Sequence, residues 1–482
     1  MLTLINTNRM QPPIAPVGLE YVACAARAAG LDVEVLDLGL VEDPGKTLQD
    51  YFAGHQPRLV GLSFRNLDDS FWPSAQWFAP DLAGTVRTLR GLTAAPLVLG
   101  GIGFSLFANR LVGYTGADFG IRGDGEGAIV SLYRELAGPT RFDRVPGLVC
   151  TGPGRTLANP PSWPESPTVP PVRDLVDHAT YLKRGGQIGF ETKRGCDRRC
   201  IYCADPLAKG AALRVRPAEE VADEIESLAD QGIDVFHTCD AEFNIPRQHA
   251  VAVCEEMVRR GLARRVRWYA YLSVVPFDED LARWMRRAGC VGINFTTDAA
   301  CPEMLAVYSQ PYAREAIVQA IRLCRGHGMA VMTDMLLGGP GETPQTLAQT
   351  IAFMRQVGPD GVGTSLGVRI YPDTEMERIV RSQGPLEANP GIRRRYDGPV
   401  DLFRPTFYVS PLLGPNPARL VKDLIAGDPR FFEPMEEAPA GQAGHADSKD
   451  HNYNENTELT GAIAAGARGA YWHILLRLRG LA

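Results

Sequence analysis

Hydrophobic and polar positions divide the chain into two stretches in which short apolar runs alternate with amphipathic segments. In the first, residues 1–145, apolar runs predict strands at Leu2–Ile5, Val33–Leu36, Leu59–Ser63, Leu97–Leu99 and Phe119–Ile121. Helical spacing predicts helices between them, for example at Leu19–Ala29, Phe78–Leu89 and Ala128–Leu136. This alternation is typical of an α/β fold with a doubly wound, Rossmann-like parallel sheet. Ligands of such sheets bind at the carboxyl ends of the strands.

The second stretch, residues 186–400, contains six strand–helix units. Strands are predicted at Ile188–Thr192, Val235–Cys239, Arg267–Leu272, Val291–Thr296, Val331–Leu336 and Val362–Ile370. Helices are predicted at, among others, Ala218–Gln231, His249–Gly261, Glu279–Ala288, Ala313–Gly328 and Pro344–Val357. Six such units fit a partial TIM-type (β/α)6 barrel, whose chemistry gathers at the C-terminal ends of its strands.

Composition separates these stretches and marks a third region. Residues 146–185 are rich in proline and glycine and are predicted to form a linker. Residues 401–482 are predicted to form a small, mostly helical C-terminal region that can act as a lid over a cavity. It closes with one predicted helix, from about Asn456 to Leu478. A chain of 482 residues is too long for a single core, which agrees with several domains.

Charge and apolar patterning restrict the class of partner. The net charge is −6, so the chain offers no basic field for nucleic acid or for an anionic membrane. The first residues lack the apolar region of a secretory signal, and no apolar run reaches about 18 residues. We therefore expect a cytoplasmic protein with reduced cysteines that binds neither nucleic acid nor membrane.

Three cysteines at C-x3-C-x2-C spacing, Cys196, Cys200 and Cys203, are the strongest chemical signal in the chain. Cysteine is scarce here, with 10 in 482 residues, so this spacing is rarely produced by chance. Three thiolates can hold three irons of a [4Fe-4S] cubane and leave the fourth iron open. Structural zinc needs a fourth ligand, and no further Cys or His lies nearby in the sequence. Zinc and buried structural cysteine remain as alternatives.

The triplet, with Tyr202 directly before its third cysteine, resembles the motif of the radical S-adenosylmethionine (SAM) superfamily. The resemblance implies a [4Fe-4S] cluster on the three cysteines, SAM on the open iron with its adenine near Tyr202, and an electron donor for the cluster. It also implies SAM contacts at the strand ends of the barrel. The candidates are Asp240, Glu242, Ser273, Thr296, Asp298, Gly338, Gly339, Arg369 and Tyr371.

Asp240 and Glu242 stand where that superfamily usually has a Gly-Gly-Glu sequence. A carboxylate at this point suits the ammonium group of SAM. Two other interpretations stay open: a carboxylate that caps the open iron and keeps SAM from chelating it, or an acid that interacts with a helix dipole. Tyr269 and Tyr271 lie two apart on the third barrel strand and point the same way. They are candidates to orient a substrate or relay a proton, with core packing as the alternative.

The N-terminal layout is similar to the cobalamin-binding domain that precedes many radical SAM domains. Residues 12–21 and the glycine turns at 100–101 and 123–126 carry the likeness. It implies cobalamin contacts, for which the candidates are Pro12, Pro16, Ser63, Asn66, Gly100, Gly101, Gly123, Gly125 and Glu126. A nicotinamide site is disfavoured, because no G-x-G-x-x-G sequence follows the first strand.

The older cobalamin signature, D-x-H-x-x-G, is missing from the loop after the third strand. We therefore expect no histidine on the lower face of cobalt and take Arg65 as the candidate occupant, with a catalytic role. A guanidinium is always protonated and cannot donate a lone pair to the metal, so the cobalt should release a methyl cation more readily. Alternatively, Arg65 pairs with Asp68 or Asp69.

Together these resemblances imply a cobalamin-dependent radical SAM methyltransferase, similar in layout to the tryptophan 2-C-methyltransferase group. It would move a methyl group from SAM via methylcobalamin to a carbon of a small molecule such as a natural product or an amino acid. Three alternatives remain. They are non-radical C-methylation of an indole such as tryptophan, a radical rearrangement or cyclisation without methyl transfer, and a non-catalytic corrinoid and cluster sensor.

Overall fold

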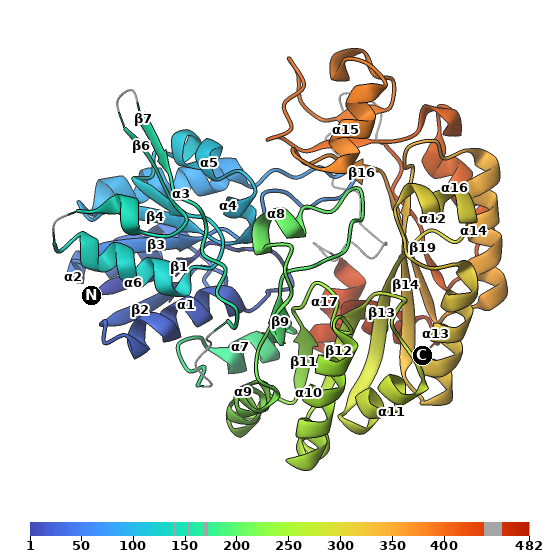
Figure 1. Ribbon diagram of the computed structural model, residues 1–482, viewed down its shortest axis with the longest axis horizontal. Helices are drawn as coiled ribbons and strands as arrows, with labels where there is room; N and C mark the ends of the chain where they lie inside the picture. Colours follow the sequence, from blue (N-terminus) through green and yellow to red (C-terminus); the bar gives the residue numbers. More distant parts are fainter. Residues whose placement is uncertain (139, 153–154, 168–171, 438–455, 482) are drawn as a thin grey trace. The chain divides into compact units, whose positions relative to one another are not determined.

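A computed structural model describes residues 1–138, 140–152, 155–167, 172–437 and 456–481. The chain folds into two compact units, each with its own sheet (Figure 1). Unit 1 comprises Met1–Asp68, Trp77–Asp197 and Asp205–Ile233. Unit 2 comprises Asp69–Gln76, Arg198–Ala204 and Asp234–Ala482. Two short segments, 69–76 and 198–204, therefore belong to unit 2, although the residues on both sides of each segment belong to unit 1.

Unit 1 is built on a sheet with the strand order β2-β1-β3-β4-β5-β6-β7. The first five strands in sequence are parallel, and β6 and β7 add an antiparallel hairpin at one edge. The bounds are β1 Leu2–Asn6, β2 Val33–Asp37, β3 Leu59–Ser63, β4 Leu97–Gly100, β5 Phe119–Ile121, β6 Leu148–Gly152 and β7 Arg155–Ala158. The doubly wound parallel sheet that the apolar runs predicted is confirmed.

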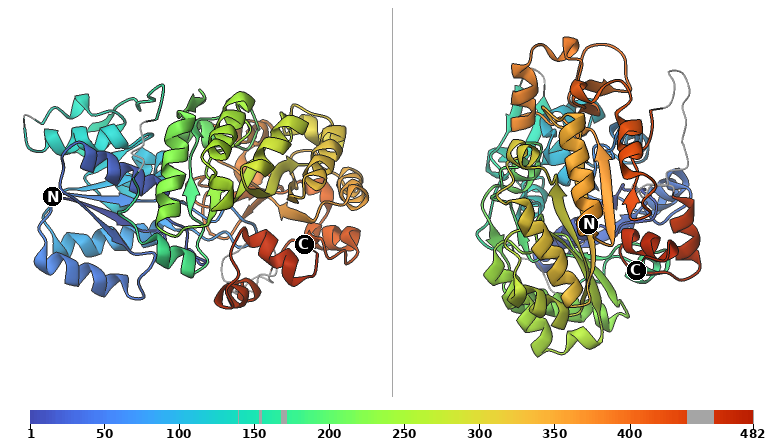
Figure 2. Two further views of the ribbon diagram at one scale, coloured as in Figure 1. Left: turned by 90° about the horizontal axis from the view of Figure 1, so that it is seen from below. Right: turned by 90° about the vertical axis from the view of Figure 1, so that its right-hand side faces the viewer.

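Helices cover both faces of this sheet, as Figure 2 shows. α1 (Val17–Ala28) and α6 (Glu126–Glu135) pack together on one face, and α2 (Pro44–Gly54) and α3 (Ala79–Leu92) lie on the other. α5 (Ala108–Thr115) packs beside α3. The buried residues of α1 recur at helical spacing and join the strand side chains in one core, because only one face of an amphipathic helix is apolar.

The stretch predicted as a linker, residues 146–185, belongs to unit 1. Its hairpin, β6 and β7, extends the sheet, and a short helix, α7 (His178–Lys183), follows. Residues 153–154 and 168–171 of this stretch lie outside the described residues. This part of the chain is therefore integrated into a core instead of only connecting two cores.

Buried charges explain why residues up to 233 belong to unit 1. Arg173 Nε donates to Glu20 on α1 at 2.7 Å, and Arg173 also pairs with Glu224 of α9 (Ala218–Asp230) at 2.9 Å. Arg216 pairs with Glu224 at 2.6 Å, and His178 Nε2 lies 3.1 Å from Glu20. Burial acts to raise the pKa of Glu20, but Arg173 and His178 outweigh it and lower that pKa. We call these five residues the buried ion cluster. Because it holds α9 to α1, the unit boundary differs from the predicted domain limit at residue 186.

Unit 2 is built on parallel strands in the order β11-β12-β13-β14-β15-β19. Their bounds are β11 Val235–Thr238, β12 Arg267–Leu272, β13 Cys290–Asp298, β14 Ala330–Leu337, β15 Gly361–Leu366 and β19 Phe431–Phe432. The helices that alternate with them are α10 Arg247–Arg259, α11 Glu279–Arg287, α13 Arg314–Gly326, α14 Pro344–Val357 and α16 Pro417–Ile425. Figure 1 shows these helices on the outer side of the sheet. The predicted partial barrel is confirmed.

The last predicted barrel strand, Val362–Ile370, is wrong as a single element. β15 ends at Leu366, and β16 (Val368–Arg369) joins a small antiparallel sheet with β18 (Thr406–Tyr408) and β17 (Ile392–Arg394). Gly367 between them has φ +100° and lies against Trp72, so a side chain there would be strained and crowded. The positive φ turns the chain out of the main sheet.

The predicted C-terminal helix is also wrong as one element. It is two helices, α17 (Thr457–Ala464) and α18 (Tyr471–Leu478). Gly466 at φ +100° and Gly469 at φ +134° separate them, because these backbone conformations are incompatible with a continuous right-handed helix. α18 packs against the inner face of the unit 2 sheet: a Cβ added to Gly292 would lie 3.1 Å from Trp472, and one added to Gly361 would lie 2.9 Å from Leu476.

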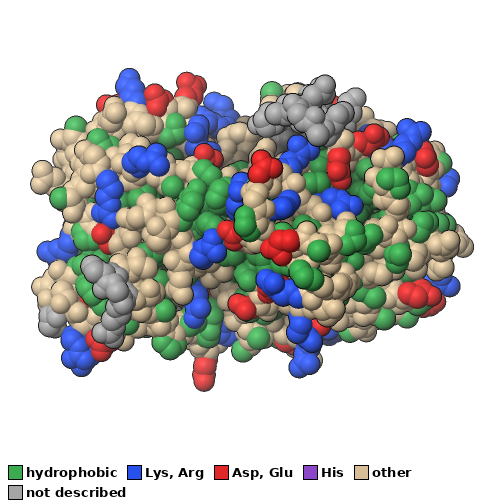
Figure 3. Space-filling view, turned by 90° about the horizontal axis from the view of Figure 1, so that it is seen from above, with side chains coloured by type: hydrophobic (Ala, Val, Ile, Leu, Met, Phe, Trp, Pro, Cys, Tyr) green, Lys and Arg blue, Asp and Glu red, His purple; other side chains and the backbone are tan. Residues whose placement is uncertain are grey.

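The surface agrees with the small negative net charge. On the face seen in Figure 3, basic and acidic side chains are interspersed. Among the described helices, none is long and apolar enough to cross a membrane.

Candidate functional site

The loops at the carboxyl ends of β3 and β4 are tied together by backbone hydrogen bonds. Phe64 N–H donates to Gly100 O at 2.8 Å, and Gly103 N–H donates to the carbonyls of Phe64 and Arg65 at 3.1 and 3.0 Å. A Cβ on Gly101 would lie 2.6 Å from Phe64 O, and Gly101 has φ +101°. Glycine is therefore required there, because only glycine allows both the close approach and the positive φ.

A single hydroxyl joins the β4 loop to the β5 loop. Ser105 Oγ donates to Gly101 O at 3.0 Å and accepts from Gly123 N–H at 3.1 Å. The nearest atom to a Cβ on Gly100 would be 4.0 Å away, so this strand end faces open space. Gly125 precedes α6 directly. Gly100 thus leaves open backbone at the edge where parallel sheets bind large ligands, which fits a corrin, whereas a Cβ on Gly123 would lie 2.9 Å from Trp163.

The remaining predicted cobalamin contacts lie on the same edge of unit 1. Pro12 and Pro16 are buried in the loop after β1, whose Ala15 N–H donates to Gln187 O at 3.1 Å. Ser63 ends β3, and its carbonyl accepts from Thr7 Oγ1 at 2.7 Å. The loops after β1, β3, β4 and β5 are therefore joined to one another by hydrogen bonds.

Arg65 is exposed at the carboxyl end of β3. Its guanidinium donates to Asn66 Oδ1 at 2.8 Å. No histidine occurs in the loop 63–69, so among these described residues no imidazole can ligate cobalt. The cation of this loop is therefore Arg65.

Arg194 connects the cysteine loop to the cobalamin-type loops. It lies on β9 (Lys193–Arg194), is 9% exposed, and pairs with Glu126 at 2.6 Å and Asp124 at 3.3 Å. Arg214, on β10 (Arg214–Val215), pairs with Asp124 at 2.5 Å. Glu126 was predicted as a cofactor contact, and in this structure its carboxylate binds Arg194. The entry to the cysteine loop is thereby fixed to the start of α6.

The cysteine loop begins at a glycine that no other residue could replace. Gly195 has φ +83°, and a Cβ there would collide with the carbonyl of Ala212. Cys196 N–H donates to Gly210 O at 3.2 Å. α8 (Asp205–Lys209) follows the loop and packs against α4 (Ile102–Ser105), which follows the Gly100-Gly101 turn. The loop is therefore held at both ends within unit 1.

The middle of the same loop belongs to unit 2, where a polar network holds it. Tyr202 OH donates to both carboxylate oxygens of Asp298, at 2.8 and 2.7 Å. Gln310 Nε2 donates to Asp298 and lies 3.6 Å from Cys200 Sγ. Burial raises the pKa of Asp298 to about 7, although the hydrogen bonds from Tyr202 and Gln310 oppose that rise. Asp298 has φ +57°, a left-handed conformation that is uncommon for non-glycine residues but is tolerated by Asp.

The three cysteines of the loop are free thiols in this structure. All ten cysteines lie in the described part of the chain, and none forms a disulfide. Cys196 is buried, and Cys200 and Cys203 are half-buried. Among the described residues, no three Cys, His, Asp or Glu side chains converge on one ion position. In a [4Fe-4S] cubane each thiolate binds a separate iron, so three free thiols in one loop fit such a cluster.

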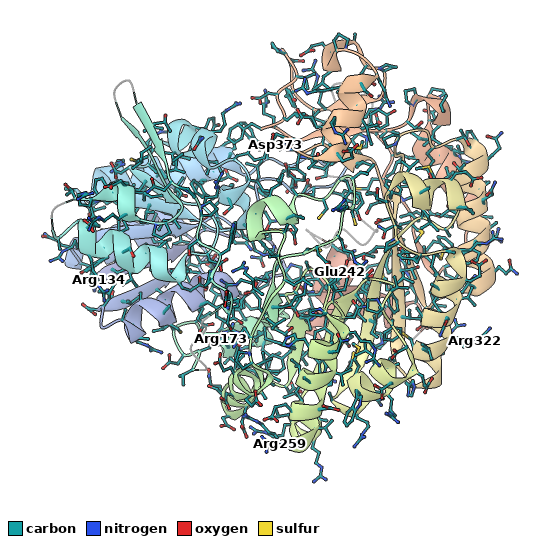
Figure 4. The ribbon with its side chains drawn as sticks, viewed as in Figure 1. Arg134, Arg173, Glu242, Arg259, Arg322 and Asp373 are labelled. Carbon is teal, nitrogen blue, oxygen red and sulfur yellow. The ribbon has the colours of Figure 1, made fainter. Side chains whose placement is uncertain are left out.

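The predicted SAM contacts of the first barrel strands lie at strand ends. Glu242, labelled in Figure 4, follows β11 and accepts a hydrogen bond from Thr296 Oγ1 of β13 at 2.8 Å. Asp240, two residues before Glu242 in the sequence, is buried. Ser273 follows β12, and its N–H donates to Asn244 Oδ1 at 3.2 Å. Glu242 and Thr296 are thus brought together from different strands, as expected for a site at the carboxyl edge.

The glycine turn after β14 is built around a buried acid. Gly338 has φ +89°, and its N–H donates to Glu342. A Cβ on Gly339 would collide with the hydroxyl of Tyr308. Burial raises the pKa of Glu342 to about 7, against the hydrogen bonds from Gly338 and Gly339. Both predicted glycines are therefore required by local packing, whatever ligand lies nearby.

Arg369 and Tyr371 stack on each other. The guanidinium carbon of Arg369 lies 4.6 Å from the Tyr371 ring centroid. Arg369 donates to the carbonyls of Ile370 at 2.6 Å and Leu402 at 3.0 Å. Tyr371 OH lies 2.9 Å from Ser70 Oγ, in the segment 69–76 that belongs to unit 2. Arg369 thus supports the turn that presents Tyr371.

The two barrel tyrosines differ in surroundings. Tyr269 is 5% exposed, its OH lies 2.9 Å from His473 Nδ1, and its ring stacks on His237 at 5.3 Å between centroids. Burial lowers the pKa of His473 to about 4 and that of His237 to about 3, so both rings are neutral near pH 7. Tyr269 is therefore packed in the core with α18. Tyr271 is half-buried and remains the better substrate-facing candidate.

Comparison with known proteins decides the family. The Radical SAM superfamily model matches residues 190–354, and the B12 binding domain model matches residues 4–133. The chain is 30% identical to the tryptophan 2-C-methyltransferase of Streptomyces laurentii, over 98% of this chain and 95% of that protein. The chain belongs to the cobalamin-dependent radical SAM C-methyltransferases.

Solved structures agree with this assignment. The methyltransferase TsrM from Kitasatospora setae, with tryptophan and a SAM analogue bound, matches with a TM-score of 0.90 at 31% identity, covering 99% of this chain and 98% of that chain. The cobalamin-dependent radical enzyme OxsB matches with a TM-score of 0.70 at 16% identity, covering 85% of this chain and 64% of that one. The OxsB likeness shows a shared fold alone.

The methyltransferase uses a [4Fe-4S] cluster, cobalamin and SAM, and its substrate is a small molecule. When bound, cobalamin carries the methyl group that SAM supplies. Four polar residues near the predicted site escaped the sequence analysis: Arg194, Gln310, and the hydrogen-bonded pair Asn294 and Asp334. Polar residues inside a buried parallel strand are a signal that could have found Asn294 and Asp334, because such strands are ordinarily apolar runs. Arg194 and Gln310 have no comparable signal, since their partners are distant in the sequence.

Proposed function

We propose that this methyltransferase acts on tryptophan and methylates C2 of its indole ring. The observation that carries the proposal is the 30% identity, over 98% of this chain, to a protein named for that reaction. The related structure with a TM-score of 0.90 holds tryptophan and a SAM analogue. Coverage along the whole chain matters, because substrate specificity lies in loops and terminal regions that vary between barrel enzymes.

In this proposal the residues keep the roles that their positions support. Cys196, Cys200 and Cys203 hold the cluster, and the turns of unit 1 hold cobalamin. The Thr296 hydrogen bond to Glu242 supports an oriented carboxylate at the strand ends. That carboxylate either receives the ammonium group of SAM or caps the open iron.

The proposed reaction is redox neutral. The S–CH3 bond of SAM breaks, a C–CH3 bond forms at the ring carbon, and the hydrogen of that carbon leaves as a proton. The products are S-adenosylhomocysteine, 2-methyltryptophan and one proton. The indole ring is electron-rich and can supply the electron pair of the new bond, so a polar route suits this substrate. The exposed cation Arg65, which has no lone pair to donate to cobalt, supports the same route.

Isotope labelling tests the proposal. The reconstituted enzyme is given SAM and tryptophan deuterated at indole C2, and the products are separated by mass spectrometry. We expect methylated tryptophan that has lost the deuterium, with one S-adenosylhomocysteine per product and no 5′-deoxyadenosine. Retained deuterium would place the methyl group elsewhere, and no methylated tryptophan would refute the substrate. Cys196→Ala, reconstituted in parallel, is the negative control.

A second candidate is radical methylation of an unactivated carbon in another small molecule, which the match to the Radical SAM superfamily favours. That route consumes a second SAM and yields 5′-deoxyadenosine together with S-adenosylhomocysteine. It also needs a stoichiometric reductant, whereas the polar route does not. The electron donor, the cytoplasmic location and the absence of nucleic-acid or membrane partners stay predictions.

A further inference from the structure

The inner face of the unit 2 sheet carries polar side chains in its middle layer. The strand register places Tyr271 beside Asn294, Thr296 beside Asp334, and Asp334 beside Gly363. Register partners in a sheet share one face, and residues two apart on a strand do so as well. These five residues therefore line the same face, where parallel strands are ordinarily apolar.

Asn294 and Asp334 form a pair with two acceptor atoms left over. Asn294 Nδ2 donates to Asp334 Oδ2 at 2.7 Å, and this bond fixes the orientation of the amide because a carboxylate can only accept. Asn294 Oδ1 and Asp334 Oδ1 are both buried without a hydrogen-bond partner among the described residues. Asn294 is 2% exposed, so solvent does not satisfy its oxygen. Two buried oxygens thus lack the donors that such atoms ordinarily have.

The charge of Asp334 is likewise not neutralised by a described Lys, Arg or His side chain within ion-pair distance. Asp298 is near enough for its electrostatic effect to be felt, and it is another carboxyl group. Asp334 itself is half-buried, and its buried Oδ1 is the atom that lacks a donor. A cation with N–H donors would satisfy both the two acceptor oxygens and the carboxylate.

The space around the pair is shaped by glycine and by the C-terminal helix. A Cβ on Gly363 would collide with Asp334 Oδ1 and lie 3.1 Å from Met332 Cε, so glycine keeps the carboxylate uncovered. Trp472 and Leu476 of α18 occupy the space beside Gly292 and Gly361, near the starts of β13 and β15. The pair therefore lies between the apolar side chains of α18, Trp472 and Leu476, and the strand ends that bear Glu242 and Thr296.

We propose that Asn294 and Asp334 form the subsite that binds the α-ammonium group of an amino-acid substrate. An ammonium group supplies three donors and a positive charge. The donors match the two unpartnered oxygens, Asn294 Oδ1 and Asp334 Oδ1, and the positive charge matches the carboxylate of Asp334. An indole N–H supplies one donor and no charge and leaves one oxygen unsatisfied. This inference rests on the proposed function, because it names the part of the substrate that the same site recognises. SAM carries the same group and is the competing source of the ammonium.

Binding measurements separate these sources. Isothermal titration of the cluster- and cobalamin-loaded enzyme without SAM gives dissociation constants for tryptophan and for 3-indolepropionate, which lacks the amine. We expect Asp334→Asn to weaken tryptophan about 10- to 100-fold, the range for a hydrogen bond to a charged group, and to leave 3-indolepropionate nearly unchanged. Asn294→Ala, which keeps the carboxylate, should weaken tryptophan less. Asp423→Asn on the exposed face of α16 is the matched control.

Each result of these titrations either supports or overturns the proposed ammonium subsite. Equal effects on both ligands, or none, would overturn the subsite, and so would weaker binding of a SAM analogue with tryptophan unaffected. Unchanged cobalamin and cluster absorption shows that each variant is folded and loaded. If the wild-type enzyme does not methylate tryptophan, the proposed function fails, and tryptamine against 3-methylindole decides the subsite. A loss in Asp334→Asn for the amine alone supports it, and equal binding, or binding of neither compound, overturns it.

Discussion

Buried carboxylates are treated in opposite ways in the two units. In unit 1, Glu20 and Glu224 are at most 1% exposed, and Arg173 bridges them at 2.7 and 2.9 Å (Figure 4 labels Arg173). In unit 2, Asp334 and Glu342 each keep a buried oxygen without a hydrogen-bond partner among the described residues. Both arrangements carry similar groups out of water, but only the first supplies their counter-charges from the chain itself.

The two units thus differ in whether their buried carboxylates have partners. Paired carboxylates stabilise the fold, whereas carboxylates with an unsatisfied oxygen can bind a ligand. A buried ion pair with both partners present is satisfied, and removing one partner is costly. A buried acceptor without a donor is a permanent cost in the free protein and is offset only when a ligand supplies the donor. Four sets of variants test this contrast between the two units.

The cysteine loop is the extreme case of side chains arranged for a ligand. Replacing Cys196, Cys200 and Cys203 by Ala together should abolish methyl transfer, because no thiolate remains to hold the cluster. Iron content and the visible absorption of the reconstituted protein measure the loss. Cys324→Ala, at a buried cysteine of α13 outside the triplet, is the control and should keep its iron. A triple variant that still binds iron in cluster form would contradict the assignment.

Breaking the buried ion cluster should unfold unit 1 more easily. Arg173→Met leaves Glu20 and Glu224 buried without their shared cation, so the free energy of unfolding should fall by about 3–5 kcal/mol. Urea titration followed by circular dichroism measures the change. Arg134→Met, at an exposed arginine of α6, should change it by less than about 0.5 kcal/mol. A small effect of Arg173→Met would show that the pairing contributes little.

Glu342 should give unit 2 a pH-dependent stability. Burial raises its pKa from 4.5 in the unfolded chain to about 7 in the folded one. Between these values the folded state binds more protons, so stability falls as pH rises from 4.5 to 7 and is constant beyond. The difference should be as large as roughly 3 kcal/mol. Glu342→Gln should remove this contribution and leave that of Asp298, whose pKa burial also raises to about 7, whereas Glu303→Gln on the exposed face of α12 (Pro302–Val307) should remove neither. Denaturant titrations at pH 5 and pH 8 supply the comparison.

Neutralising the unpaired carboxylate should have the smallest effect on stability. Asp334→Asn removes a half-buried charge that forms no ion pair with any described residue, so the free energy of unfolding of the ligand-free protein should change by less than about 1 kcal/mol, or rise. Thermal melts of the two variants Asp334→Asn and Arg173→Met, run side by side, display the contrast directly. A large destabilisation by Asp334→Asn would mean that this acid builds structure after all.

The sequence predicted the elements better than their grouping. Apolar runs identified the parallel strands of both units, because buried strands need such runs wherever they occur. Residues 146–185 were assigned to a linker by composition, yet they contribute β6 and β7 and, through Arg173 and His178, the buried ion cluster. Ion pairs between residues 153 positions apart, such as Arg173 and Glu20, leave no local pattern to read.

For the candidate site, the sequence likewise predicted individual residues better than the contacts between them. The sequence alone identifies the cysteines, Glu242 and the glycine turns as site residues, because their spacing or backbone requirement is local. The contact between Glu242 and Thr296 depends on the alignment of β11 and β13, and Asp298 reaches Tyr202 only through a bulge in β13. Arg369 and Tyr269 were predicted as cofactor or catalytic residues. Their contacts are a backbone-supporting network and a core stack, respectively.

By itself the sequence determined the chemistry that this protein can perform: three thiolates at cluster spacing, a sheet with glycine turns but no histidine for cobalt, and a barrel with acids at its strand ends. Each of these depends on residue type and short spacing. Only the tertiary structure decided which charges are neutralised within the chain and which are not. Neutralisation depends on distances of about 3 Å between residues far apart in sequence, and those distances exist only after the strands have taken their register.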